Sequence, residues 1–204
     1  LNNKFLSFSS KFLSFNLMKI TLLTANHPRH NYLIKILSEV CKELYVIQET
    51  RSIFPGKNKR GLYFKSRIHQ NYFKKVNKAE IKIFGKNYLN INKKKISLLA
   101  IERNDLNLLK LNEIKPFLKS DIYIIYGTSI IKGPLLAFLK KKKCINIHNG
   151  ISPYYIGSDC NFWAVYDKNF SLAGSTVHYL TKKLDFGEVL FHSSSFYNGK
   201  NPFA

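Results

Sequence analysis

The stretch that decides the fold begins at residue 121 and reads Asp121-Ile122-Tyr123-Ile124-Ile125-Tyr126-Gly127. A nearly continuous apolar run closed by a glycine is typical of a central strand in a parallel sheet, because such strands are buried on both faces. A helix is predicted over residues 134–141, since Pro134 is tolerated in a first helical turn. A further strand is predicted over residues 144–148. This succession of strand, turn, helix and strand indicates a parallel sheet covered by helices.

The upstream sequence extends the same alternation. Strands are predicted over residues 19–24 and 44–48, with a helix over residues 30–43 between them. Helical spacing of apolar residues also predicts helices over residues 65–84 and 106–118. We therefore expect an α/β fold of the Rossmann-like class, with a mostly parallel sheet and helices on both faces. The segment after the first strand lacks a GxGxxG motif, and no Walker sequence occurs, so nucleotide sites of those two kinds are not indicated.

The chain is strongly basic. Its 204 residues include 33 Lys and Arg against 12 Asp and Glu, which gives a formal net charge of +21. Such a balance favours partners that carry phosphate, including nucleic acids. The excess is mostly lysine and is accompanied by many Asn and Ile residues, a mixture that an AT-biased genome produces without selection. Composition alone leaves both interpretations open.

The cysteines indicate neither a metal site nor a disulfide framework. Cys41, Cys144 and Cys160 are odd in number and have no CxxC spacing. A reducing cytoplasm is the location that this usage predicts. No stretch approaches the roughly 18 apolar residues that span a bilayer, so no membrane partner is expected.

Three polar side chains lie where the predicted sheet ends. Asn146 and His148 occupy alternate positions of one strand, so they project to the same side, and parallel sheets bind ligands at the carboxyl ends of their strands. Asp185 stands on a turn ahead of a strand predicted over residues 188–192. An amide can donate to a developing oxyanion, an imidazole can shuttle a proton, and a carboxylate can relay it. The set indicates acyl transfer, although each residue taken alone is more often structural.

The order and approximate spacing of these residues resemble the catalytic domain of the folate-dependent formyltransferases. Asn146-Ile147-His148 is followed by a loop, Ser152-Pro153-x-x-x-Gly157, and then by Leu184-Asp185-x-Gly187. The resemblance covers residues 18–195 and implies 10-formyltetrahydrofolate as co-substrate. It also implies that Asn146 and His148 act on the formyl oxygen and the tetrahedral intermediate, and that Asp185 supports proton removal from the attacking amine.

The resemblance assigns two binding loops and no metal. The loop after the central strand is implied to hold the pterin through Tyr126, Gly127, Thr128, Ser129, Ile130 and Ile131. The loop after the next strand is implied to bind the acceptor through Asn149, Gly150, Ser152, Pro153, Tyr154 and Gly157. Ile156 departs from the basic residue that the family usually carries before the loop glycine, which puts a substrate or loop-anchoring contact in doubt.

The same resemblance suggests how the chain is organised. Residues 1–17 precede the only methionine, Met18, and are interpreted as a disordered leader or an artefact of the assigned start. Residues 18–204 are expected to form the catalytic domain, truncated at its C-terminal end.

The acceptor is expected to be a primary amine on a nucleotide-linked amino sugar. The segments Asn146-Ile147-His148-Asn149-Gly150 and Asp159-Cys160-Asn161-Phe162-Trp163 look more like the sugar-modifying members than like the purine-pathway enzyme. A methionyl-tRNA formyltransferase, which the basic charge would suit, and a truncated inactive relative remain the alternatives. A deformylase and a basic nucleic-acid-binding module are less favoured, and the oligomeric state is left open.

Overall fold

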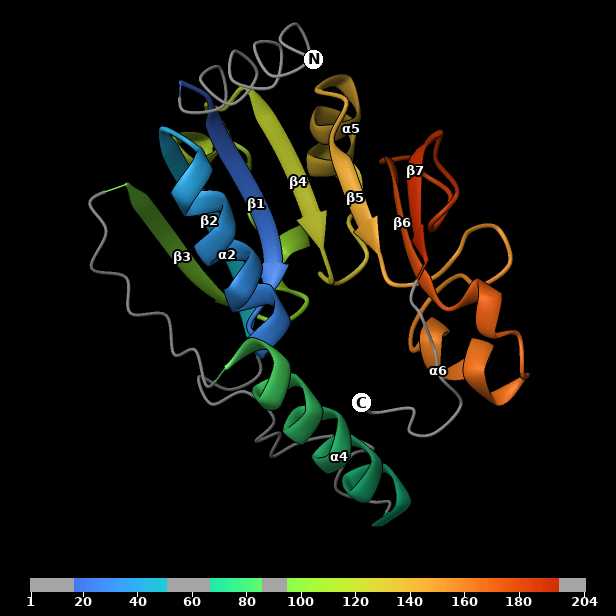
Figure 1. Cartoon of the computed structure of the whole chain (residues 1–204). Coiled ribbons are helices and arrows are strands. Elements are labelled where there is room, and N and C mark those ends of the chain that lie inside the picture. The colour runs from blue at the N-terminus through green and yellow to red at the C-terminus, as the bar shows by residue number, and fades with distance from the viewer. Residues whose placement is uncertain (1–16, 51–66, 86–94, 195–204) are drawn as a thin grey trace, which may run out of the picture.

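The computed structural model describes residues 17–50, 67–85 and 95–194. The expected leader, apart from Leu17, and the last ten positions of the chain lie outside the described residues. Seven strands form one sheet in the order β3-β2-β1-β4-β5-β6-β7 (Figure 1). The strands are β1 (Lys19–Ala25), β2 (Glu43–Thr50), β3 (Ile96–Glu102), β4 (Ile122–Tyr126), β5 (Ile145–His148), β6 (Gly174–Tyr179) and β7 (Val189–Ser194).

The strands from β3 to β5 run parallel, whereas β6 and β7 are antiparallel to their neighbours. The helices are α2 (Pro28–Val40), α4 (Arg67–Phe84), α5 (Gly133–Lys141) and α6 (Cys160–Tyr166), with short 3₁₀ helices η1 (Asp105–Asn107), η2 (Lys115–Leu118) and η3 (Phe170–Leu172). The Rossmann-like, mostly parallel sheet predicted from the sequence is therefore confirmed.

Alternate residues of the central strands pack into two separate apolar clusters, one on each face of the sheet. On the face covered by α2, Ile20 and Leu22 of β1 are buried with Ile34 of the helix. On the opposite face, Leu23 of β1 is buried with residues of α5, including Leu139. Because the side chains of a strand point to opposite faces in turn, one apolar strand supplies both clusters.

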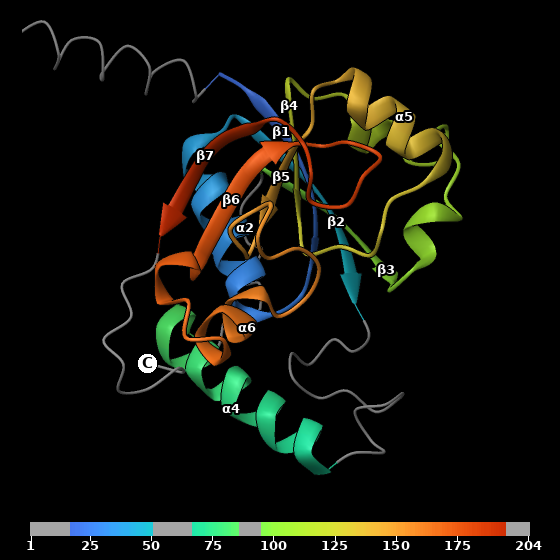
Figure 2. The same ribbon diagram turned by 90° about the vertical axis from the view of Figure 1, so that its right-hand side faces the viewer.

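The order of the strands places the carboxyl ends of the parallel strands along one edge. The chain enters the sheet at β1, extends it on one side through β2 and β3, and then returns to pair β4 with β1. A crevice outside the carboxyl ends at such a reversal is where open α/β sheets bind ligands. Both α4 and α6 lie beside this edge (Figures 1 and 2).

One helix predicted from the sequence is wrong. The segment 106–118 forms η1, a series of turns and η2 instead of one continuous helix. Pro116 cannot donate a backbone hydrogen bond and its ring clashes with the preceding turn, which opposes an α-helix through it. Leu106, Ile114 and Leu118 are nevertheless buried in the cluster on the α5 face, so the apolar spacing reflects burial without regular helix.

Other boundaries differ by a few residues. The helix predicted over 30–43 is α2, which begins at Pro28 and ends at Val40, because β2 already starts at Glu43. The helices predicted over 65–84 and 134–141 are confirmed as α4 and α5, although residues 65 and 66 lie outside the described residues. Strands β3 and β6 were not predicted.

Candidate functional site

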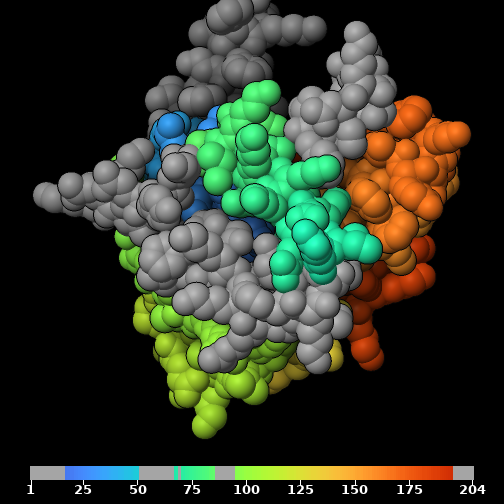
Figure 3. All heavy atoms as spheres, turned by 90° about the horizontal axis from the view of Figure 1, so that it is seen from below, coloured from blue at the N-terminus to red at the C-terminus, as the bar shows by residue number. Residues whose placement is uncertain are grey.

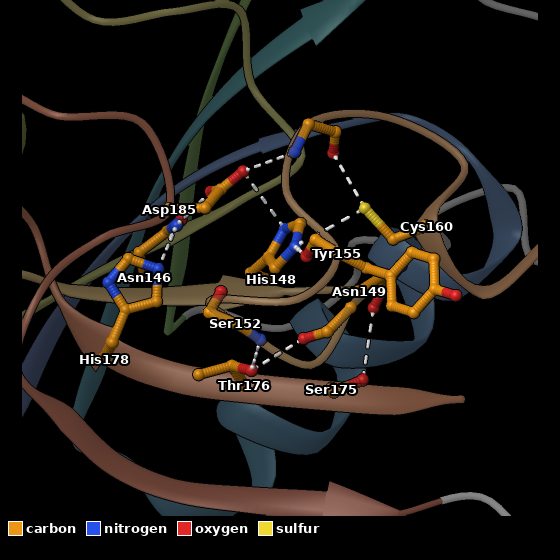
Figure 4. A network of polar contacts seen from close by, with 12 residues as sticks. Asn146, His148, Asn149, Ser152, Tyr155, Cys160, Ser175, Thr176, His178 and Asp185 are labelled. Atoms are coloured by element: carbon orange, nitrogen blue, oxygen red, sulfur yellow. Dashed lines mark hydrogen bonds and ion pairs between the residues drawn. The ribbon is translucent and has the colours of Figure 1, made fainter. Parts of the chain in front are cut away.

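The three residues predicted to carry the chemistry come together at the carboxyl end of β5. Asn146 and His148 project from the same side of that strand, and Asp185 reaches them from the turn between β6 and β7 (Figure 4). His148 and Asp185 are both buried, with exposed fractions of 6% and 8%. The spacing in the sequence therefore corresponds to direct contact in space.

Asp185 is the centre of this polar network. Its Oδ1 accepts a hydrogen bond from Asn146 Nδ2 at 3.2 Å, and its Oδ2 accepts one from the backbone N–H of Gly157 at 3.0 Å. The same Oδ2 lies 3.4 Å from His148 Nδ1. One side chain thus ties the two residues of β5 to the acceptor loop.

Both ring nitrogens of His148 face acceptors. Nε2 lies 2.9 Å from the carbonyl oxygen of Tyr155, while Nδ1 faces the carboxylate of Asp185. These two contacts fix the orientation of the imidazole ring between Asp185 and the loop that contains Tyr155. The thiol of Cys160 completes the shell, with Sγ 3.6 Å from Nε2.

Asn146 has a second partner that the sequence did not reveal. Its Nδ2 lies 3.0 Å from Nε2 of His178, which is the residue opposite Asn146 in the β5–β6 pairing. Nδ1 of His178 is 2.9 Å from the carbonyl of Tyr179, so the proton of the neutral ring is held at Nδ1 and Nε2 accepts. His178 therefore orients the amide group of Asn146, and Asp185 fixes it from the other side.

Two glycines allow the acceptor loop to close over the histidine. A Cβ at Gly150 would lie 2.6 Å from His148 Nε2 and 2.8 Å from the carbonyl oxygen of Tyr155, too close for any side chain. Gly157 has a φ of 95°, in the region where glycine is favoured, and its N–H points at Asp185. Gly150 is thus required by the close approach of His148 and Tyr155, and Gly157 by its backbone conformation.

Within the same loop, Ser152 is buried and Tyr154 is exposed. The backbone N–H of Ser152 donates to the hydroxyl of Thr176 at 2.9 Å, and that hydroxyl donates to the carbonyl of Gly150 at 2.6 Å. The Ser152–Pro153 peptide bond is cis. Tyr154 is 70% exposed. Ser152 therefore fastens the loop to β6, while Tyr154 lies open to solvent.

The sequence also shows to which protein family the chain belongs. The sequence profile of the Formyl transferase family matches residues 78–195. The chain belongs to this family. Its fold resembles glycinamide ribonucleotide transformylase 1 from Geobacillus kaustophilus, at 16% identity over 91% of this chain and 87% of the other, with a TM-score of 0.54.

Two further solved structures have similar folds. One is phosphoribosylglycinamide formyltransferase from Bacillus halodurans, at 16% identity, covering 90% of this chain and 83% of the other with a TM-score of 0.54. The other is a 4-N formyltransferase from Francisella tularensis, at 15% identity, covering 90% of this chain and 58% of the other with a TM-score of 0.51. The formyltransferase family and its fold, both expected from the sequence, are confirmed.

In this formyl transferase the two predicted binding loops touch each other. Nδ2 of Asn149 donates to the hydroxyl of Tyr126 at 3.1 Å, and its Oδ1 accepts from Ser175 at 3.5 Å. The ring of Tyr126 lies against His30, with centroids 4.4 Å apart. Gly127 and Thr128 follow directly where β4 ends. The loop assigned to the pterin and the loop assigned to the acceptor are therefore joined through the contact between Tyr126 and Asn149.

A buried carboxylate holds the loop after β4. Glu49 is 2% exposed and accepts hydrogen bonds from the backbone N–H of Ser129 at 2.5 Å and from its hydroxyl at 2.6 Å. It also accepts one from the backbone N–H of Asn104 at 3.0 Å. Ile130 is 59% exposed, whereas Ile131 is buried in the cluster on the α5 face. Glu49 was not identified from the sequence, because a glutamate ending a strand normally lies in solvent.

Neither a metal site nor a membrane segment is found in the described part of the chain. Residues 17–50, 67–85 and 95–194 contain no group of three or more His, Cys, Asp and Glu side chains arranged to hold a metal ion. Among the helices of those same residues, none is both long and apolar enough to cross a bilayer.

Proposed function

We propose that this chain transfers a formyl group from 10-formyltetrahydrofolate to the primary amine of a nucleotide-linked amino sugar. The observation that carries the proposal is the contact of Asp185 with both Asn146 and His148 at the carboxyl end of β5. An amide, an imidazole and a carboxylate within one network are groups that can catalyse transfer of an acyl group to an amine.

Each residue has a defined task in this proposal. Formyl transfer places developing negative charge on the formyl oxygen, and Asn146 and His148 supply N–H donors that stabilise it. The attacking amine forms the new carbon–nitrogen bond and loses a proton, for which the carboxylate of Asp185 is the acceptor. The bond between the formyl carbon and N10 of the folate then breaks, and N10 takes up one proton as tetrahydrofolate leaves. The amide hydrogens of Asn146 are already directed at Asp185 and His178. The ring nitrogens of His148 already face Asp185 and the carbonyl of Tyr155. Donation to the formyl oxygen by either residue therefore requires one of these contacts to give way.

The surroundings of the network suit a folate donor. The loop after β4 is held by Glu49 and exposes Ile130, which provides an apolar contact and backbone groups of the kind that flat heterocycles bind. Tyr126, at the base of that loop, contacts Asn149 of the acceptor loop. A reduced folate bound there would present its formyl group to the carboxyl end of β5.

The choice of acceptor rests on charge and on the sequence around α6. Because the net charge is +21, an acceptor that carries phosphate is favoured over a neutral amine. The related folds include both purine-pathway and sugar-modifying enzymes, so they do not choose between these acceptors. The alternative that the charge equally suits is the aminoacyl group of an initiator tRNA.

Mass spectrometry of reaction mixtures tests the proposal. The full chain is incubated with 10-formyltetrahydrofolate and, separately, with UDP- and dTDP-linked amino sugars, glycinamide ribonucleotide and methionyl-tRNA. We expect one formyl group on a sugar nucleotide and none on the other acceptors. The Asn146→Ala variant, as control, should lower turnover by on the order of a hundredfold. Formylation of the tRNA or of glycinamide ribonucleotide in preference would replace the proposed acceptor, and no formylation of any acceptor would refute the function.

A further inference from the structure

Helix α6 has one face on the catalytic histidine and the other in solvent. Cys160 and Ala164 are 2% and 0% exposed, and Cys160 Sγ lies 3.6 Å from His148 Nε2. On the opposite side, Trp163 is 49% exposed and Tyr166 is 69% exposed. A short helix of which one turn touches the reaction centre therefore presents large aromatic rings to solvent.

These rings form a continuous surface that reaches α4. The aromatic patch consists of Tyr72 of α4 with Phe162, Trp163 and Tyr166 of α6. The centroids of Tyr72 and Phe162 are 5.2 Å apart, Phe162 and Trp163 are 5.1 Å apart, and Trp163 and Tyr166 are 5.7 Å apart. Figure 3 shows α4 and the orange segment that contains α6 side by side, on the side of the molecule where the parallel strands end.

The exposed face of α4 beside the patch is basic. Lys75 follows Tyr72 by three residues, so the two side chains share a face of the helix. Lys78 and Lys82 continue the same row, and all three lysines are exposed. Glu80 is the only acidic residue of α4, and it is buried in an ion pair with Arg29. The row of lysines is therefore not neutralised from within its own helix.

Two acidic residues flank α6 at the edge of the patch. Asp159, directly before the helix, is close enough to Tyr72 that its charge adds to burial, the larger cause, in raising the pKa of Tyr72 to about 12. Asp167, directly after Tyr166, is exposed and accepts a hydrogen bond from the hydroxyl of Tyr155 at 3.0 Å. Carboxylates next to aromatic rings and lysines suit a ligand that carries hydroxyl donors as well as phosphate.

We infer that the aromatic patch and the lysine row of α4 form a subsite for the nucleoside diphosphate part of the acceptor. The base stacks on the rings of Trp163 and Tyr166, and the phosphates face Lys75 and Lys78. The proposed subsite is connected to the catalytic network through α6, since Cys160 of that helix lies 3.6 Å from His148 Nε2. This inference rests on the proposed function and specifies where its acceptor binds.

The chemistry of the patch favours this ligand over other occupants. An aromatic stack alone would suit an apolar partner, but such a partner would not require the lysines beside it. A nucleotide uses both, because every base has a face for stacking and each phosphate oxygen accepts hydrogen bonds. Helix α6 has only seven residues, which matches a small ligand better than a long polyanion.

The chain contains one tryptophan, Trp163, so its fluorescence reports directly on the patch. UDP, dTDP and inorganic pyrophosphate are titrated separately into the full-length protein without folate. We expect UDP or dTDP to quench the fluorescence with saturation and to compete with each other. Pyrophosphate, which has no base, should bind at least about tenfold more weakly, as expected from the loss of one stacking interaction.

Paired variants locate the binding. Tyr166→Ala should weaken nucleotide binding by about tenfold, whereas Leu108→Ala, at a similarly exposed position directly after η1, should leave it unchanged. The Lys75→Ser and Lys78→Ser double variant should weaken UDP binding. The loss should be about tenfold larger than that of the control double variant on α5, Lys140→Ser with Lys141→Ser. Equal melting temperatures of the variants would exclude loss of folding as the cause.

The outcomes separate this inference from the proposed function. Nucleotide binding at Trp163 without formyl transfer would overturn the function and keep the subsite. Formyl transfer to a sugar nucleotide whose KM is unchanged in the Tyr166→Ala and the α4 lysine variants would overturn the subsite and keep the function. A transfer RNA that displaces UDP at a lower concentration than UDP itself requires would replace the nucleoside diphosphate with a nucleic acid and would likewise overturn the subsite.

Discussion

Asp185 has a left-handed backbone conformation, with a φ of 48°, in the turn between β6 and β7. This conformation costs an L-residue about 1–2 kcal/mol, and aspartate is among the residues that tolerate it best. The cost is offset by the donors that the conformation brings to the carboxylate, from Asn146 and from the backbone of Gly157. The turn is therefore shaped by the polar network that it completes.

Coupling between Asp185 and His148 is the first prediction. Asp185→Asn keeps the size of the side chain and removes the charge that faces His148, so turnover should fall by on the order of a hundredfold or more. His148→Ala should be similarly severe. Because residues that act as a unit are not additive, the double variant should be little slower than the slower single variant. Steady-state kinetics with a working acceptor measures all three.

Near-normal turnover in Asp185→Asn would show that the carboxylate only stabilises the turn. Fully additive losses in the double variant would show that the two residues act independently. Folate affinity of each variant, measured by calorimetry, should change little, because the hydrogen bonds of both side chains among the described residues go to partners outside the loop proposed to hold the folate.

The second prediction concerns the thiols. Burial raises the pKa of Cys160 from its ordinary value of 9.0 to about 11, and it also raises the pKa of Cys41 and of Cys144. Since the thiolate is the reactive form, none of the three should react rapidly with a thiol reagent at pH 8 in the folded protein. All three should react once the chain is unfolded.

The raised pKa of Cys160 also makes the stability of the protein depend on pH. Between pH 9.0 and about 11 the unfolded chain releases the Cys160 proton while the folded chain keeps it, so the free energy of unfolding falls as the pH rises through this window. Below pH 9.0 both states hold the proton and this contribution is complete. Urea unfolding at several pH values should show a smaller slope for Cys160→Ala, and an unchanged slope would contradict the assignment.

At the scale of elements, the loop after β4 depends on β2 through Glu49, and this gives the third prediction. Glu49→Gln keeps the shape but places amide hydrogens against the N–H and hydroxyl groups of Ser129. Stability should fall by about 1–3 kcal/mol, because buried donors lose an ionised acceptor. The KM for the folate should rise while kcat and the acceptor KM stay near normal.

Glu102→Gln is the matched control, since that glutamate ends β3 in an exposed position. It should change neither stability nor the folate KM. A destabilised Glu49→Gln enzyme with an unchanged folate KM would mean that Glu49 supports only the fold, and that the folate contacts another surface.

Elements with a simple apolar pattern were predictable from the sequence, and those that bury polar groups were not. The run at β4 has isoleucines on both faces, so its position in the centre of the sheet followed from composition. In β6 the buried positions are instead Gly174, Thr176 and His178, which serve the site and leave no apolar alternation to detect. The strand was missed for this reason, and with it the partner of Asn146.

The proximity of the proposed catalytic residues was predictable for a different reason. Asn146 and His148 share a side of β5 because of strand geometry, so their proximity follows from spacing alone. Their contact with Asp185 depends on a turn between two antiparallel strands, and only the resemblance to a family indicated it. Glu49 had no such guide, since its partners come from loops after β3 and β4.

At the scale of the whole molecule, the net charge of +21 has two competing explanations, biased composition and selection for anionic ligands. They differ in what salt should do, and this is the fourth prediction. If the positive field draws in an anionic acceptor, kcat/KM should fall as salt rises from about 0.1 M to about 1 M, because the screening length shrinks from about 10 Å to about 3 Å. The value of kcat should remain constant, since the bound state is already formed.

With folate saturating, an amino sugar that lacks the diphosphate provides the control and should show no such decline. The Lys75→Ser and Lys78→Ser double variant should lose part of the salt dependence, and the α5 lysine pair should lose less. A kcat/KM that is flat in salt for the charged acceptor would assign the lysines to composition alone and leave the acceptor to be held by the polar network and the aromatic patch.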